Sequence, residues 1–177
     1  QTITNSKIII VSNPLDAMVY AALKILKFPR EHVIGMAGIL DSARMSHFIC
    51  EKLGYGAGQI ESSVMGGHGD AMVPLVNYST VAGVSLPELL SKEDIEDIVT
   101  KTKNGGLQIV KLLETGSAYY APAHATSLMV EAILYNNKKI YPCSVMLDGE
   151  YDCKNVVSGV PVMLGSNGIE KIIELKL

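Results

Sequence analysis

The chain is organised around residues 64–70, which read Val-Met-Gly-Gly-His-Gly-Asp. His68 stands among three glycines, and apolar runs precede and follow the glycine segment. These runs predict two short buried strands with a turn between them. Because glycines remove side-chain bulk and permit a positive φ, such a turn lets the backbone and the imidazole come close to a ligand.

Two interpretations of His68 follow. The simpler one is a buried, hydrogen-bonded histidine in a structural turn, which an isolated motif of this kind would favour. The other is an acid/base, because an imidazole titrates near neutral pH and can carry a proton in either direction. A second stretch favours the acid/base: residues 40–44 read Leu-Asp-Ser-Ala-Arg and supply the carboxylate of Asp41 and the guanidinium of Arg44.

Composition indicates a globular chain with one sizeable core. The 177 residues are 48% hydrophobic and 19% charged, with a net charge of −3. We therefore expect neither nucleic acid nor an anionic membrane as a partner, and no apolar run reaches membrane-spanning length. No signal peptide is visible, and three cysteines without paired spacing favour a reducing, cytoplasmic compartment. His47 and Cys50 are one helix turn apart, but no second pair completes a zinc site, so we predict no metal.

The first secondary-structure unit should end at a ligand-binding edge. Residues 7–12 predict a buried strand of the parallel kind, and a helix should follow at 15–26, after Asn13-Pro14. Asn13 then lies at the carboxyl end of a buried strand, where open α/β sheets bind ligands. Asn13 has two equally possible roles on this pattern: a ligand contact or a helix cap.

The next unit carries the charged pair. We expect a strand at 33–38 and a helix at 41–53, whose first turn holds Asp41 and Arg44 on one face. A pair at this spacing can also be a weak surface ion pair.

The rest of the chain predicts helices and then antiparallel strands. We expect either a kink or close packing at the glycine pair 105–106, and a structural role for His124 in a buried helix. The remaining elements that we expect are a loop at 54–58, helices at 86–90, 92–113 and 123–135, strands at 140–148, 150–153 and 156–164 with a turn at 148–149, and an amphipathic helix from 168 that stops after about two turns.

Asn13, Asp41, Arg44 and His68 together suit one kind of chemistry. A carboxylate bonded to one imidazole nitrogen fixes the tautomer and stabilises the imidazolium. The other nitrogen can exchange a proton with a substrate hydroxyl, and the guanidinium can grip a planar carboxylate in bidentate fashion. The set suits interconversion of a 2-hydroxy acid and a 2-oxo acid, with a hydride passing to a cofactor. A hydrolase using His68 and Asp41 is a weaker interpretation, since no serine or cysteine occupies a nucleophile elbow.

Three segments, taken in order, resemble the lactate/malate dehydrogenase family: residues 11–16 (Val-Ser-Asn-Pro-Leu-Asp), 40–44 and 66–70. The resemblance covers essentially the whole chain. It implies an α+β fold like the family's C-terminal domain, with mixed helices and antiparallel strands, preceded by the last strand of a Rossmann sheet. It divides the chain into a remnant of the NAD-binding domain at 1–16 and a substrate and catalytic domain at 17–177.

The resemblance also implies roles for single residues. His68 matches the family's proton-transfer histidine, Asp41 its carboxylate partner, and Arg44 its clamp for the substrate carboxylate. The other site residues that the resemblance implies are Asn13 and Ala118 for the substrate, and Val11, Ser12, Asn13 and Met36 for the cofactor NAD.

The malate branch of the family fits better than the lactate branch. Residues 66–67, 70–74 and 118–123 resemble the lactate-dehydrogenase-like malate dehydrogenases, whereas lactate dehydrogenases usually carry a glutamate before the histidine and another residue at Ala118. The resemblance therefore implies NAD-dependent interconversion of malate and oxaloacetate in the tricarboxylic acid cycle, by a homo-oligomeric dimer or tetramer. Lactate dehydrogenase or another 2-hydroxy acid dehydrogenase is the alternative.

These 177 residues contain no G-x-G-x-x-G turn. The family's N-terminal half has no counterpart here, including the acidic ribose-binding residue and the loop arginine that reads the second carboxylate of oxaloacetate. We therefore expect a piece of a longer protein that is inactive alone. A non-catalytic folding and assembly fragment is the alternative from another class.

Overall fold

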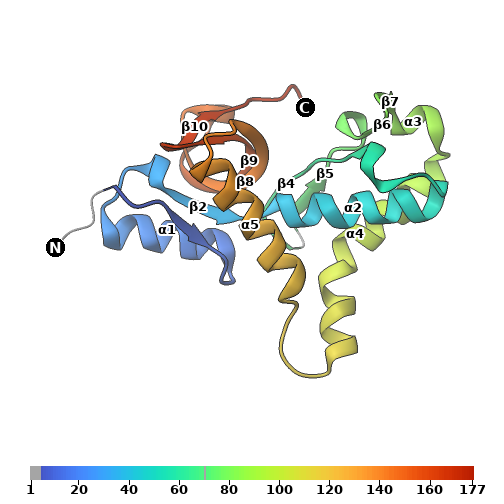
Figure 1. Ribbon diagram of the computed structural model, residues 1–177, viewed down its shortest axis with the longest axis horizontal. Coiled ribbons are helices and arrows are strands. Elements are labelled where there is room, and N and C mark those ends of the chain that lie inside the picture. The colour runs from blue at the N-terminus through green and yellow to red at the C-terminus, as the bar shows by residue number, and fades with distance from the viewer. Residues whose placement is uncertain (1–4, 70) are drawn as a thin grey trace.

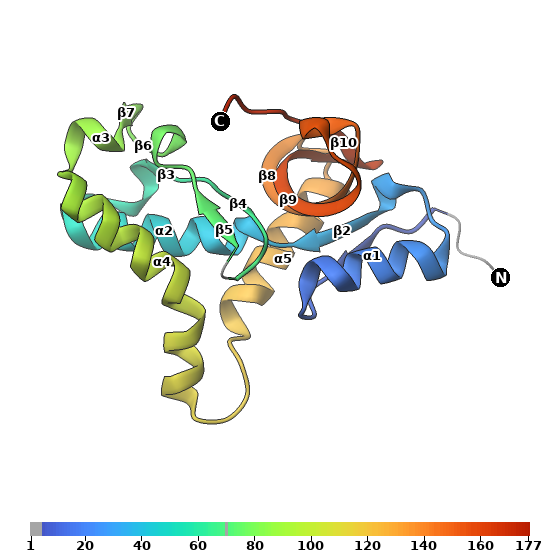
Figure 2. The same ribbon diagram turned by 180° about the vertical axis from the view of Figure 1, so that it is seen from behind.

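The computed structural model describes residues 5–69 and 71–177. A mixed sheet of seven strands runs through the molecule in the order β1-β2-β8-β9-β4-β5, with β10 also paired with β9, and helices lie against it (Figures 1 and 2). Its strands are β1 (Ile8–Ile10), β2 (Val33–Met36), β4 (Val64–Gly66), β5 (Met72–Pro74), β8 (Lys139–Asp148), β9 (Lys154–Gly165) and β10 (Gly168–Ile172). A smaller sheet contains β3 (Ile60–Glu61), β6 (Thr80–Val81) and β7 (Val84–Ser85). The α-helices are α1 (Leu15–Leu26), α2 (Gly38–Leu53), α3 (Leu86–Leu89), α4 (Lys92–Leu113) and α5 (Tyr120–Leu134).

The N-terminal unit is a parallel βαβ crossover. β1 and β2 pair in parallel, with Ile9 opposite Ile34, and α1 connects them while burying Leu15 and Val19. The helix predicted for this segment is confirmed with its bounds. The strand is shorter than predicted, 8–10 rather than 7–12, and its residues are partly buried rather than buried. The domain boundary that we place between residues 16 and 17 would fall inside α1, and it stays a prediction.

The long strands β8 and β9 form an antiparallel hairpin that curls beside α5 (Figure 1). They pair from Lys139 opposite Leu164 to Asp148 opposite Lys154. Apolar side chains on their inner face form the main buried cluster of the molecule together with α5, which contributes Met129. The predicted antiparallel arrangement of this region is therefore confirmed.

Two details predicted for the C-terminal third are wrong. Residues 150–153 are not a strand, because Gly149 at φ +127° and Tyr151 at φ +55° turn the chain through a short 3-10 segment. Residues 168–175 do not begin a helix, because Gly168 at φ +90° closes a hairpin and β10 then pairs with β9. Asn-Gly is a strong hairpin signal, and here Asn167-Gly168 overrides the helical spacing of the isoleucines that follow.

Helices α2 and α4 pack against each other in the other half of the molecule (Figure 1). Met45 and Ile98 lie in the apolar cluster between them, each at most 2% exposed. Helix α4 has the predicted bounds and continues through Gly105 without a break. The glycine pair therefore serves close packing, which was one of its two predicted roles.

Helix α5 departs from its prediction in two ways. It begins at Tyr120 rather than residue 123, since Pro122 is tolerated in a first helical turn, where its missing N–H has no partner to lose. It is buried on one face only, and Leu134 is 73% exposed. His124 lies on the exposed part of this helix.

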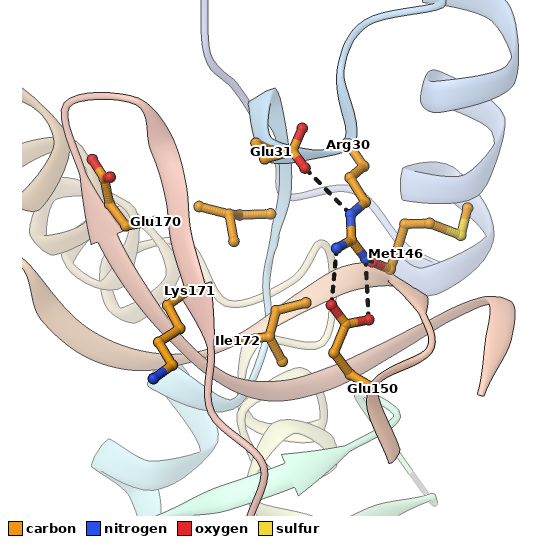
Figure 3. Close-up of a pocket in the computed structure, with 8 residues that line it drawn as sticks. Arg30, Glu31, Met146, Glu150, Glu170, Lys171 and Ile172 are labelled. Atoms are coloured by element: carbon orange, nitrogen blue, oxygen red, sulfur yellow. Dashed lines mark hydrogen bonds and ion pairs between the residues drawn. The ribbon is translucent and has the colours of Figure 1, made fainter. Parts of the chain in front are cut away.

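A cavity of about 250 Å³ beside β10 is bordered by an internal ion pair (Figure 3). The Arg30 guanidinium donates to both carboxylate oxygens of Glu150, at 2.8 and 3.1 Å, and to the Met146 carbonyl oxygen at 3.2 Å. This bidentate contact lowers the pKa of the Glu150 carboxyl from 4.5 to about 2. Because Arg30 and Glu150 satisfy each other, we assign this pair a structural role.

The ion pair predicts a defined pH dependence of stability. Glu150→Gln should lower the free energy of unfolding by about 1–2 kcal/mol at pH 7, since it removes one partner of a charged bidentate contact. Because folding lowers the pKa of the Glu150 carboxyl, the ionised carboxylate stabilises the fold above pH 4.5, and this contribution disappears as the pH falls toward 2. Urea unfolding from pH 7 to pH 2 should therefore show the two proteins converging. Glu61→Gln, at an exposed position of β3, is the control, and an equal loss there would contradict the assignment.

Candidate active site

The first two turns of α2 place two charged side chains of the site. α2 begins at Gly38, where a Cβ atom would overlap the Val64 carbonyl oxygen, so only glycine lets the helix start this close to β4. Asp41, in the first of these turns, is 1% exposed. Arg44 follows on the same face and donates from Nη1 to Asp41 Oδ1 at 3.1 Å.

Serine hydroxyls fasten α2 to the strand that carries the histidine turn. The Val64 N–H donates to Ser42 Oγ at 2.9 Å, and Ser62 Oγ donates to the Ser42 carbonyl oxygen at 2.6 Å. Ser42 is the immediate neighbour of Asp41. These bonds therefore fix the carboxylate relative to the start of β4.

The turn between β4 and β5 presents His68. The two strands predicted from the apolar runs are present and pair with Met65 opposite Val73. β4 is largely buried as predicted, whereas Val73 in β5 is exposed. Gly66 at φ +82° and Gly69 at φ +122° adopt backbone conformations that other residues rarely adopt. Asp70, which belongs to the predicted motif, lies outside the described residues.

Asp41 joins the histidine and the arginine. His68 Nδ1 lies 2.8 Å from Asp41 Oδ2, while Asp41 Oδ1 accepts from Arg44. A buried carboxylate is costly unless it is paired, and this one has two partners. Because Asp41 occupies Nδ1, Nε2 is the ring nitrogen left for a ligand.

His68 and Arg44 both line a cavity of about 610 Å³. The predicted site residues Val11, Asn13, Met36 and Ala118 line the same cavity. The structure thus brings together residues from β2, α2, the histidine turn and the segments before α1 and α5. Ser12 is exposed, but it is not among the residues that line the cavity.

Sequence reasoning missed the wall of this cavity that α4 supplies. Its residues are Lys103, Gly106, Leu107 and Val110. Their spacing of three, four and seven along α4 is that of one helix face, and this regularity was the only signal in the sequence. Gly105 explains how α4 comes so near, since a Cβ there would lie 3.3 Å from Arg44 Cδ.

Within residues 5–69 and 71–177, no three His, Cys, Asp or Glu side chains gather where they could hold a metal ion. No helix in that part of the chain is both long and apolar enough to cross a membrane.

The sequence model for the lactate/malate dehydrogenase alpha/beta C-terminal domain matches residues 39–177. The chain belongs to the lactate/malate dehydrogenase family. The malate dehydrogenase of Sulfurimonas denitrificans is 69% identical over 170 residues, which are 96% of this chain and 53% of that protein. This chain spans about half the length of the curated family members it matches.

Solved structures of the family superpose closely on this fold. The malate dehydrogenase of Aeropyrum pernix has a TM-score of 0.96 at 46% identity, over 99% of this chain and 58% of that one. The lactate dehydrogenase of Eimeria maxima, solved with NADH and oxamate, has a TM-score of 0.95 at 42% identity, over 99% of this chain and 54% of that one. The predicted family and fold class are confirmed. Asp41, Arg44 and His68 lie inside the matched domain, and Asn13 precedes it.

Proposed function

We propose that the chain is the catalytic and substrate-binding part of a longer NAD-dependent malate dehydrogenase, which interconverts malate and oxaloacetate. One observation carries this proposal: the Asp41 carboxylate contacts both His68 and Arg44, and both of these line one cavity with Asn13. The names of the curated relatives favour malate over lactate. The close fit to a lactate dehydrogenase structure makes lactate the second candidate substrate.

In this proposal, Arg44 and Asn13 bind the substrate. Arg44 donates from Nη1 to Asp41 and lines the cavity. Its planar guanidinium can hold the carboxylate next to the reacting carbon through two parallel hydrogen bonds. Asn13, at the same cavity, can hydrogen-bond the carbonyl or hydroxyl oxygen through its side-chain amide.

In this proposal, His68 transfers the proton. In the direction of oxaloacetate reduction, the imidazolium donates the Nε2 proton to the carbonyl oxygen, which becomes the hydroxyl of malate, and the ring is left neutral with its proton on Nδ1. Asp41 accepts a hydrogen bond from Nδ1–H throughout. The carboxylate thereby fixes the tautomer and stabilises the charged ring. In malate oxidation the same nitrogen takes the proton back.

The cavity also suits one end of a nicotinamide cofactor. Val11 and Met36 form an apolar part of its wall beside His68 and Asn13, and Val11 is 42% exposed. An aromatic amide ring could pack against such a wall with its polar edge toward Asn13. When bound, NADH would supply the hydride that the carbonyl carbon accepts. Ser12, off the cavity wall, remains a predicted contact to a more distant part of the cofactor.

The outer face of α5 supports a proposal about assembly. Tyr120, Leu134 and Tyr135 are each more than 70% exposed on or beside this helix. Large exposed side chains at both ends of one helix favour burial against another surface. We propose that the full-length protein is a cytoplasmic homo-oligomer, and an assembly role without catalysis is the competing function of this segment.

The first functional prediction concerns His68. In the full-length enzyme, His68→Asn should lower kcat for oxaloacetate reduction by about two to four orders of magnitude, because the proton donor is lost. His47→Asn, at an exposed position of α2 outside the cavity lining, is the matched control and should stay near the unmodified rate. Steady-state NADH oxidation measures both, and a His68→Asn enzyme with normal turnover would remove His68 from the mechanism.

Arg44 gives a second prediction with a different readout. Arg44→Lys keeps the charge but loses the planar fork, so KM for oxaloacetate should rise about tenfold or more while KM for NADH changes little. Arg30→Lys, outside this cavity, controls for general effects on the fold. If KM for NADH rose as much as KM for oxaloacetate, Arg44 would have a structural role.

A third prediction separates this chain from the full-length enzyme. Residues 1–177 alone should show no measurable reduction of oxaloacetate with saturating NADH, although they hold Asn13, Asp41, Arg44 and His68. The reason is positioning, since the pyrophosphate and adenosine sites belong to a βαβ unit with a glycine-rich turn that these residues do not contain. Turnover close to that of the full-length enzyme would contradict this.

A further inference from the structure

Helix α4 brings a second cation to the cavity. Lys103 lines the cavity on the same helix face as Gly106, Leu107 and Val110. The neighbouring lysine on α4 is engaged elsewhere, since Lys101 pairs with Asp97 at 2.8 Å. Lys103 has no ion-pair partner among the residues that the structure describes.

Lys103 and Arg44 approach the same part of the cavity from different helices. A Cβ on Gly106 would lie 3.5 Å from Arg44 Nη1. Lys103 precedes Gly106 by one helical turn on the same face, and residues so related have neighbouring side chains. The long flexible stem of a lysine lets its ammonium group move over several ångströms around that point.

The charges at this end of the cavity match a substrate with two carboxylates. Arg44 suffices for one carboxylate, and part of its charge is already offset by Asp41 behind it. Among the described residues that line the cavity, Lys103 is the other permanently charged cation at neutral pH. A four-carbon 2-oxo diacid carries a second negative charge that Lys103 can reach, whereas a monocarboxylic 2-oxo acid does not.

We propose that Lys103 is a specificity-determining residue that binds the second carboxylate of a dicarboxylic 2-oxo acid. This inference rests on the proposed function and deepens it. Lys103 acts from the α4 wall of the cavity, in addition to the loop arginine that the family resemblance implies for the N-terminal half. Its contribution is to discrimination between substrates, not to the proton transfer at His68.

The test compares Lys103→Met with Lys101→Met in the full-length enzyme. Three quantities are measured: KM for oxaloacetate, and the inhibition constants of hydroxymalonate, with two carboxylates, and oxamate, with one. For Lys103→Met, the oxaloacetate KM and the hydroxymalonate constant should each rise about five- to tenfold, the size expected for one solvent-screened charge contact. The oxamate constant and KM for NADH should change less than about twofold. Lys101→Met should change none of these, and Lys103→Arg should restore most of the affinity for hydroxymalonate.

Each other outcome overturns the inference in a recognisable way. Equal weakening of hydroxymalonate and oxamate would mean that Lys103 does not distinguish the two carboxylates. No weakening of either would remove Lys103 from the substrate site, and a raised KM for NADH would assign the lysine to the cofactor. Failure of the unmodified protein to reduce oxaloacetate at all would overturn the proposed function, and with it this inference.

Discussion

The site depends on one buried carboxylate with two partners. Asp41 contacts His68 through one oxygen and Arg44 through the other, and it is almost fully removed from solvent. A carboxylate buried in this way costs free energy unless both oxygens are paired. The same pairing that offsets this cost also sets the ring tautomer of His68 and directs the guanidinium of Arg44. Stability of the turn and readiness for chemistry therefore come from a single set of contacts.

The surrounding fold serves to hold that carboxylate in place. Gly38 lets α2 begin against β4, and Ser42 then fastens the first turn of the helix to the strand that leads to His68. On the other side, Gly105 allows α4 to approach Arg44 closely enough to wall the cavity. Small residues at these contacts bring three segments, far apart in the sequence, to one point. A larger side chain at Gly38 would move Asp41 away from the turn.

Much of this arrangement could be predicted from the sequence, where local pattern and tertiary structure agree. The bounds of α1 and α4, the strands around the histidine turn and the Asp41–Arg44 spacing all follow from short-range signals. The strand after Gly168 had a local signal in Asn167-Gly168, which outweighs the helical spacing of the isoleucines that follow. Two other features could not be predicted from local pattern, because the exposed face of α5 depends on which elements pack against the helix, and Lys103 belongs to no motif.

The most direct test of the central claim is to determine which ring nitrogen carries the proton in neutral His68. Long-range proton–nitrogen NMR of the imidazole, at a pH where the ring is neutral, distinguishes a proton on Nδ1 from one on Nε2. We predict the Nδ1–H tautomer in the unmodified protein, because Asp41 accepts that hydrogen bond, and a mixture of tautomers in Asp41→Ala. An Nε2–H tautomer in the unmodified protein, or no change in Asp41→Ala, would contradict the account.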